Sequence, residues 1–94
     1  MRTEPVEIYS DPPGAIVRHP GRRFPGVLVQ GDTLHTWCSS LDSICAEARG
    51  RVQEDTFVEL NDLRNRLWTA LNHYKEVLDQ HGLPLPFSEA GPRS

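Results

Sequence analysis

The fifteen residues PGRRFPGVLVQGDTL, from Pro20 to Leu34, constrain the fold more than any other stretch of the chain. They open with a two-arginine loop set between prolines and glycines, which favour turns. The apolar run at 27–30 then predicts a strand. The Asp-Thr pair that follows predicts a helix start, because a short side-chain oxygen can accept hydrogen bonds from the free amides of a first helical turn. The chain therefore passes from sheet to helix near residue 31.

The residues before this stretch predict two more strands. Apolar and polar residues alternate at 6–10, Asp11-Pro-Pro-Gly14 is a strong turn signal, and a second apolar run follows at 15–19. These three features indicate a β-hairpin. Together with 27–30, the hairpin predicts a three-stranded antiparallel meander.

Two helices are expected after the sheet. The first carries apolar residues on one face and ends near Gly50, whereas the second runs from about Glu54 to His81 and is followed by Gly82, Leu83 and Pro84, a typical helix stop. The fold class is therefore α+β, with the second helix long. We expect a single domain over residues 1–87, in which 85–87 folds back onto the core, and a flexible C-terminal tail at 88–94.

The second helix is broader and longer than one packing contact requires. Its apolar arc widens to about 160° near Trp68. Its length of about 40 Å exceeds what a short sheet and the first helix of about 25 Å can cover. We expect part of it to meet another chain, most simply in a homodimer. The candidate interface residues are Arg64, Leu67, Trp68, Leu71 and Asn72. The alternative is that Trp68 is a core residue or is covered by 83–87.

Composition excludes several classes of protein. No apolar run approaches the roughly 20 residues needed to span a bilayer. The stretch Met1–Glu7 lacks the apolar segment of a secretory signal, so we expect a cytoplasmic protein. The formal net charge of −3 does not favour wholesale attraction to nucleic acid.

The two cysteines, Cys38 and Cys45, are predicted to be buried, reduced thiols. At helical spacing they lie on one face about 10 Å apart, which is too far for a disulfide. No Cys-x-x-Cys, Glu-x-x-His or His-Glu-x-x-His spacing accompanies them, and no nucleophile with a base and an orienting group can be assembled. We expect no metal, no cofactor and no catalytic residues.

The arginine loop is the candidate binding site for an anion or a partner protein. Arginine forks pair bidentately with phosphate or carboxylate, and a neighbouring aromatic ring offers a stacking face. The alternative is a solvated connection in which Phe24 packs into the core. The candidate residues are Arg18, His19, Arg22, Arg23 and Phe24.

The stretch from Pro20 to Leu34, taken with residues 59–75, resembles a family of short, uncharacterised bacterial proteins known only as a domain of unknown function. The resemblance covers nearly the whole chain and implies no activity. A weaker resemblance, over residues 25–48, is to HicB-type antitoxins, in which Pro-Gly, a short apolar run and Gly-Asp-Thr-Leu form a strand and a helix start. The HicB pattern continues into another strand, whereas this chain continues into one long helix.

These observations favour a non-enzymatic, cytoplasmic protein–protein interaction module. The leading hypothesis places this module in a bacterial defence, toxin-antitoxin or immunity setting. The alternative is an anionic-ligand or nucleic-acid binding protein that uses the Arg22-Arg23 loop.

Overall fold

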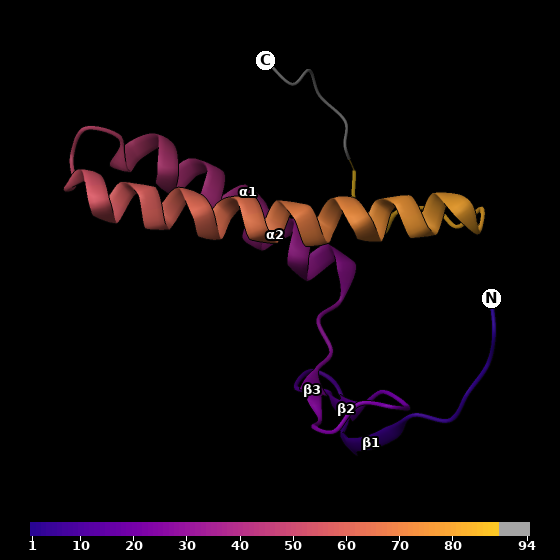
Figure 1. Ribbon diagram of the computed structural model, residues 1–94. Coiled ribbons are helices and arrows are strands. Elements are labelled where there is room, and N and C mark those ends of the chain that lie inside the picture. The colour runs from indigo at the N-terminus through magenta and orange to yellow at the C-terminus, as the bar shows by residue number, and fades with distance from the viewer. Residues whose placement is uncertain (89–94) are drawn as a thin grey trace. The chain divides into compact units, whose positions relative to one another are not determined.

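The computed structural model describes residues 1–88 and confirms the predicted α+β order, a three-stranded antiparallel sheet followed by two helices of which the second is long (Figure 1). The chain divides into two compact units: residues 1–30, here called the sheet unit, and a helical unit that begins at Gly31. Each is described by itself, and a single domain over 1–87 stays a prediction. The predicted flexible tail lies, apart from residue 88, outside the described residues.

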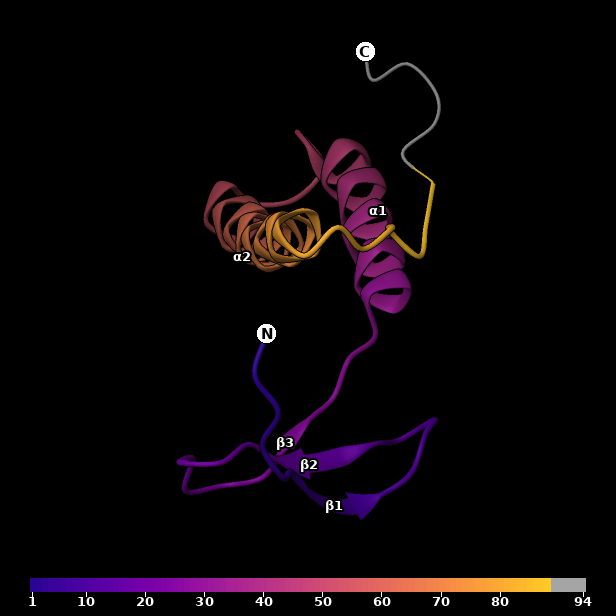
Figure 2. The ribbon, with the colours of Figure 1, turned by 90° about the vertical axis from the view of Figure 1, so that its right-hand side faces the viewer.

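The sheet unit contains β1 (Glu7–Ser10), β2 (Ile16–Arg18) and β3 (Gly26–Val27), in the order β1-β2-β3 (Figure 2). All three strands are shorter than the sequence predicted, and β3 most of all. The amide of Leu28 still donates to the carbonyl of Ala15, at 3.0 Å. Beyond that bond β2 has no residues left to pair, because the chain turns at 11–14, so the expected strand at 27–30 ends early.

A β-bulge interrupts the pairing of β1 with β2 between Ile8 and Ser10. The hydroxyl of Ser10 bridges the hairpin there, since it donates to the carbonyl of Gly14 at 2.5 Å and accepts from the amide of Ile16 at 3.1 Å. A side chain thus replaces the backbone bonds that the bulge removes.

The sheet unit buries very little. Among its residues only Ala15, with 5% of its surface exposed, is buried, and several large apolar side chains are exposed: Ile8, Tyr9, Phe24, Val27 and Leu28. A small sheet without a packed face is marginal in water. Local hydrogen bonds and turns therefore carry more of its order than a core does.

The helical unit pairs α1 (Gly31–Ala48) with α2 (Glu54–Gln80). Cys38, Cys45 and Leu71 are buried in it, with 0%, 6% and 0% exposure, which confirms that both cysteines are buried free thiols. Near the connection between the helices, the guanidinium of Arg49 lies 5.4 Å from the centre of the Phe57 ring. This unit has the packed core that the sheet unit lacks.

The start of α1 depends on a close approach. Gly31 is buried, and a Cβ atom at this position would collide with the ring of Tyr74 on α2. The helix begins at Gly31, and the carboxylate of Asp32 accepts from the amide of Thr33 at 2.9 Å. Glycine is therefore required here for space, in addition to the helix-start role that the sequence indicated for this segment.

The end of α2 follows the prediction to within one residue. The amide of Leu83 donates to the carbonyl of Leu78 at 2.9 Å and that of Gly82 to Asp79 at 3.1 Å, the two bonds of a Schellman motif. The chain then folds back as expected: the ring of Phe87 stacks on that of His35 in α1, with centroids 4.2 Å apart. Within residues 1–88, neither helix combines the length and apolarity that crossing a bilayer requires.

Candidate functional site

The loop between β2 and β3 is built on a tight turn. The amide of Arg22 donates to the carbonyl of His19 at 3.0 Å, and Gly21 has a φ of 84°. Pro20 and Gly21 hold the two central positions of this turn, as a type II turn requires, because the second central position needs a positive φ. His19 Nδ1 donates to the carbonyl of Pro20 at 2.7 Å. The turn fixes the direction in which the next residues leave the sheet.

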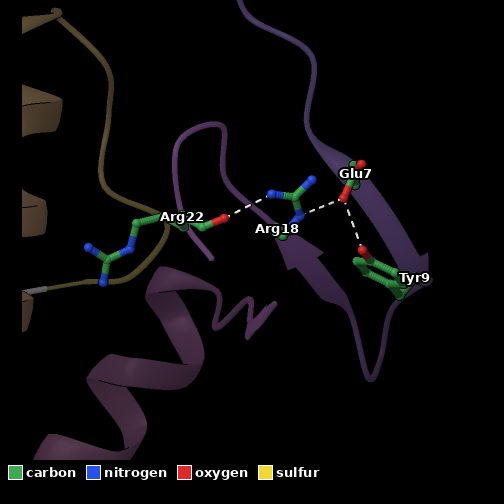
Figure 3. A network of polar contacts seen from close by, with 4 residues as sticks. All are labelled: Glu7, Tyr9, Arg18 and Arg22. Carbon is green, nitrogen blue, oxygen red and sulfur yellow. Dashed lines mark hydrogen bonds and ion pairs between the residues drawn. The ribbon is translucent and has the colours of Figure 1, made fainter. Parts of the chain in front are cut away.

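Arg18 fastens this loop to β1 (Figure 3). Its Nε donates to Glu7 Oε1 at 2.6 Å, and its Nη1 donates to the carbonyl of Arg22 at 2.8 Å. The hydroxyl of Tyr9 donates to the same Glu7 oxygen at 2.9 Å. Arg18 was predicted to bind a partner or an anion, but here its guanidinium is engaged within the sheet unit and positions the loop.

This network holds its charges at neutral pH. The hydrogen bond from Arg18, followed by that from Tyr9, lowers the pKa of Glu7 below its ordinary value. The same bond to Glu7 raises the pKa of Arg18. Arg2 and Glu4 form a second ion pair in the sheet unit. Because the unit has four arginines and three carboxylates, these pairs leave Arg22, Arg23 and Asp11 uncompensated.

Arg22, Arg23 and Phe24 extend outward from the loop. The guanidinium of Arg22 points away from the Arg18 network in Figure 3. That of Arg23 lies 5.4 Å from the centre of the Phe24 ring, within cation–π distance. Phe24 is 73% exposed, so the alternative that it packs into the core is wrong. Within residues 1–88, neither Arg22 nor Arg23 forms an ion pair.

These side chains line an open hollow of about 570 Å³. Residues 21–28 form most of its wall, and Val17 and His19 complete it. The wall therefore combines two arginines with the exposed apolar side chains of Phe24, Val27 and Leu28. His19 contributes to this hollow, so the structure brings together all the predicted loop residues except Arg18, which instead donates to the carbonyl of Arg22 in its wall.

The second predicted surface, on α2, turns largely toward α1. Arg64 Nε and Trp68 Nε1 both donate to Asp42 Oδ1, at 2.5 and 2.9 Å. Leu71 is fully buried, so it cannot contact another chain unless the helix pair opens. Leu67 is half-buried and Asn72 is exposed. The structure thus favours the alternative in which Trp68 belongs to the packing of the helical unit, while a partner contact by Leu67 and Asn72 stays a prediction.

The buried thiol beside this bridge is poorly ionised. Burial raises the pKa of Cys38, the carboxylate of Asp42 raises it further, and Arg64 opposes both effects. A neutral, inaccessible thiol is a weak nucleophile and a weak metal ligand. Within residues 1–88, no three His, Cys, Asp or Glu side chains gather where they could hold a metal ion.

Sequence reasoning missed Asp42, Tyr9 and the pairing of Glu7 with Arg18. Asp42 follows an apolar helix position and its partners lie more than twenty residues away, so no local pattern predicts the bridge. Glu7 lies opposite Arg18 in the sheet register. That pair could have been found from the hairpin by counting back from the turn, except that the bulge shifts the register by one residue.

Comparison with known proteins gives a family. A family model described as a family of unknown function, DUF6959, matches residues 1–87. The chain belongs to this family. The match confirms the expected resemblance to a domain of unknown function that covers nearly the whole chain, and the DUF6959 description brings no activity with it. No curated protein and no solved structure matches significantly, so the HicB resemblance gains no support from them.

Proposed function

We propose that this chain is a non-enzymatic protein-binding module whose contact surface is the β2–β3 loop. The observation that carries the proposal is the hollow in which Arg22, Arg23 and an exposed Phe24 stand next to Val27 and Leu28. Arginine and aromatic side chains are enriched among the residues that dominate binding energy. The turn and the Arg18 network preorganise this surface, which reduces the ordering cost of binding.

The charges favour a protein partner over nucleic acid. Nucleic-acid binding generally relies on a stripe of many basic residues, because affinity rises with the number of phosphates neutralised. Here the loop offers only Arg22 and Arg23, which have no ion pair within residues 1–88, in a chain of net charge −3. An anionic ligand or nucleic acid remains the second candidate, and the observation that favours it is that both guanidinium groups lack ion pairs within residues 1–88.

The setting that we propose is the bacterial cytoplasm, in defence, toxin-antitoxin or immunity. Its support is the resemblance of residues 25–48 to HicB-type antitoxins. A homodimer is also part of the proposal. Val58 and Leu63, 58% and 49% exposed, line one shallow depression on α2 and supply apolar surface for a second copy. Light scattering should then show a dimer for the unmodified chain and a monomer for Leu63→Asp.

Affinity capture with matched variants tests the loop. The immobilised chain should retain a partner protein, the double variant Arg22→Ala/Arg23→Ala should lose it, and Arg2→Ala/Arg51→Ala should keep it. The control pair removes the same charge from exposed sites outside the loop and outside the α2 depression. All three proteins should melt at nearly the same temperature, because exposed charges contribute little to stability.

Two results would contradict the proposal. If the loop variant retains the partner as well as the parent does, the contact surface lies elsewhere. If nuclease treatment of the lysate removes everything that the loop captures, the nucleic-acid alternative replaces protein binding.

A further inference from the structure

The β3 strand forms one edge of the sheet, and its outward backbone groups can be assigned. Ile16 lies opposite Val27, and Val17 lies opposite Gly26. Leu28 donates its amide to Ala15 across the ladder. In an antiparallel pair, residues with inward and outward backbone groups alternate. Since Leu28 and Gly26 face β2, the N–H and C=O of Val27 point away from it.

The neighbouring residues fit an edge that stays open. Pro25 has no N–H to donate, and the same alternation places its carbonyl outward beside that of Val27. Proline occurs in sheets mainly on such edges. Within the described residues, β3 has β2 as its sole strand neighbour, and outside the ladder neither the amide nor the carbonyl of Val27 is hydrogen-bonded to the backbone. The edge therefore offers Val27 N–H and two carbonyls to an incoming strand.

The hollow shares residues with this edge strand, because Pro25, Gly26, Val27 and Leu28 line it, and it also reaches Val17 on β2. A chain lying against β3 would pass beside Val27, which is 69% exposed, and beside Phe24, which precedes the strand and is 73% exposed. Arg22 and Arg23 stand at the start of the edge with no carboxylate partner within residues 1–88. Asp11 is in the β1–β2 turn, at the opposite end of the meander.

We propose that β3 binds an extended segment of a partner protein as a fourth strand, and that this segment carries carboxylates alternating with apolar residues. In strand addition, main-chain hydrogen bonds supply affinity and alternate side chains supply specificity. Val27 provides the main-chain bonds, Phe24 an apolar contact, and Arg22 with Arg23 the charge selection. This inference rests on the proposed function, because it names the kind of partner that the loop binds.

The charge distribution selects this occupant over others. A basic segment would meet two uncompensated guanidinium groups and be repelled. A nucleic-acid strand could pair with the arginines, but it would not form the strand-type hydrogen bonds that the outward N–H and C=O of Val27 offer. A second copy of this chain can also bring a β3 edge, so self-association through β3 is an outcome that the test has to separate.

The test uses the full chain, labelled for nuclear magnetic resonance, and a blocked peptide of alternating glutamate and valine as the probe. Saturating peptide should slow hydrogen exchange of the Val27 amide by about tenfold or more, because exchange then requires dissociation. The corresponding lysine–valine peptide should leave it unchanged. A glutamate–valine peptide with methylated backbone nitrogens should also fail to slow the exchange. It keeps every side chain, but its backbone has no N–H groups to donate to the carbonyls of the edge.

Protein variants sharpen the test. Val27→Pro removes the outward donor and should abolish binding; it is interpretable only if the Leu28 amide keeps its protection, which reports an intact pairing with β2. Arg22→Ala/Arg23→Ala keeps the backbone edge and should weaken binding of the acidic peptide while leaving the sheet signals in place. The methylated peptide gives the same answer without any change to the protein.

Several outcomes overturn the inference. Equal binding of the glutamate and lysine peptides removes charge selection, and binding of the methylated peptide removes strand addition. If the Val27 amide becomes protected from hydrogen exchange as protein concentration rises, without any peptide, the edge binds a second copy of this chain instead. If the acidic peptide fails while the loop variant still loses its partner in affinity capture, strand addition is wrong and the proposed function stands; if both fail, the loop is not a binding surface.

Discussion

The sheet unit and the helical unit are stabilised by different kinds of contact. The helical unit buries Cys38, Cys45 and Leu71 and joins its helices through Asp42, Arg64 and Trp68. The sheet unit buries only Ala15 among its residues and depends on a turn, a serine bridge and the Arg18 network. One unit is ordered by packing, and the other by local polar contacts that leave its apolar side chains exposed.

This difference indicates where a partner is expected. A chain segment that exposes Phe24, Val27 and Leu28 leaves apolar area in water that binding could remove, at roughly 25 cal/mol per Å². The helical unit also exposes large apolar side chains, such as Trp37 and Ile44 at 46% and 49%, but it buries Leu71, Cys38 and Cys45 in a core of its own. The sheet unit, in which only Ala15 is buried, depends more on a partner for apolar burial, and the following predictions test the contrast.

The largest effect is expected from separating the two units. A peptide of residues 1–30 should be unfolded by circular dichroism, because so short a segment cannot bury enough apolar surface to offset its conformational entropy. A peptide of residues 31–94 should retain helical signal with a cooperative melt. Folding of the shorter peptide by itself would show that local contacts suffice, and the comparison between the units would fail.

Leu71→Ala should destabilise the helical unit by about 2–5 kcal/mol, because it opens a cavity at a fully buried site. Chemical denaturation followed by circular dichroism measures this free energy of unfolding. Leu63→Ala is the matched control on the same helix, and since Leu63 is 49% exposed it should cost less than half as much. Equal losses for the two variants would mean that α2 does not use one face preferentially.

Gly31→Ala should cost about 1–3 kcal/mol, since the added methyl group meets the ring of Tyr74 and forces it to move. The same denaturation experiment measures it. Gly14→Ala is the control, because a methyl group there meets nothing within 4 Å. A neutral or stabilising result for Gly31→Ala would show that Tyr74 does not pack against the start of α1.

The smallest effect concerns pH and the sheet unit. The pKa of Glu7 is lowered in the folded chain, mainly by the hydrogen bond from Arg18. The contribution of ionised Glu7 to the stability of the sheet unit is therefore complete above its unfolded pKa of about 4.3, and it is lost as pH falls through the folded pKa. Nuclear magnetic resonance of the Arg22 amide should therefore show the loop loosening below about pH 4. Glu7→Gln should remove this pH dependence. A loop signal that titrates unchanged in Glu7→Gln would exclude Glu7 as its cause.

The sequence determined the elements and their order. Hydrophobic periodicity placed both helices to within a residue or two, since the helical repeat is a property of neighbouring residues. Three further features could be predicted for the same reason: the helix stop at Gly82-Leu83-Pro84, the turn at Asp11–Gly14 and the pair of buried cysteines. The loop residues Arg22, Arg23 and Phe24 were also identified from the sequence, because turn chemistry places such side chains at the surface.

Only the tertiary structure decided which of these side chains are free. Arg18 and Arg22 are the same residue type a few positions apart, yet the strand register gives Arg18 to Glu7 and leaves Arg22 outside. Trp68 and Phe24 are both large aromatics, but Asp42 holds the first against α1 while Phe24 stays exposed. These outcomes depend on contacts between residues distant in the sequence, and local propensity carries no information about which distant group will lie opposite.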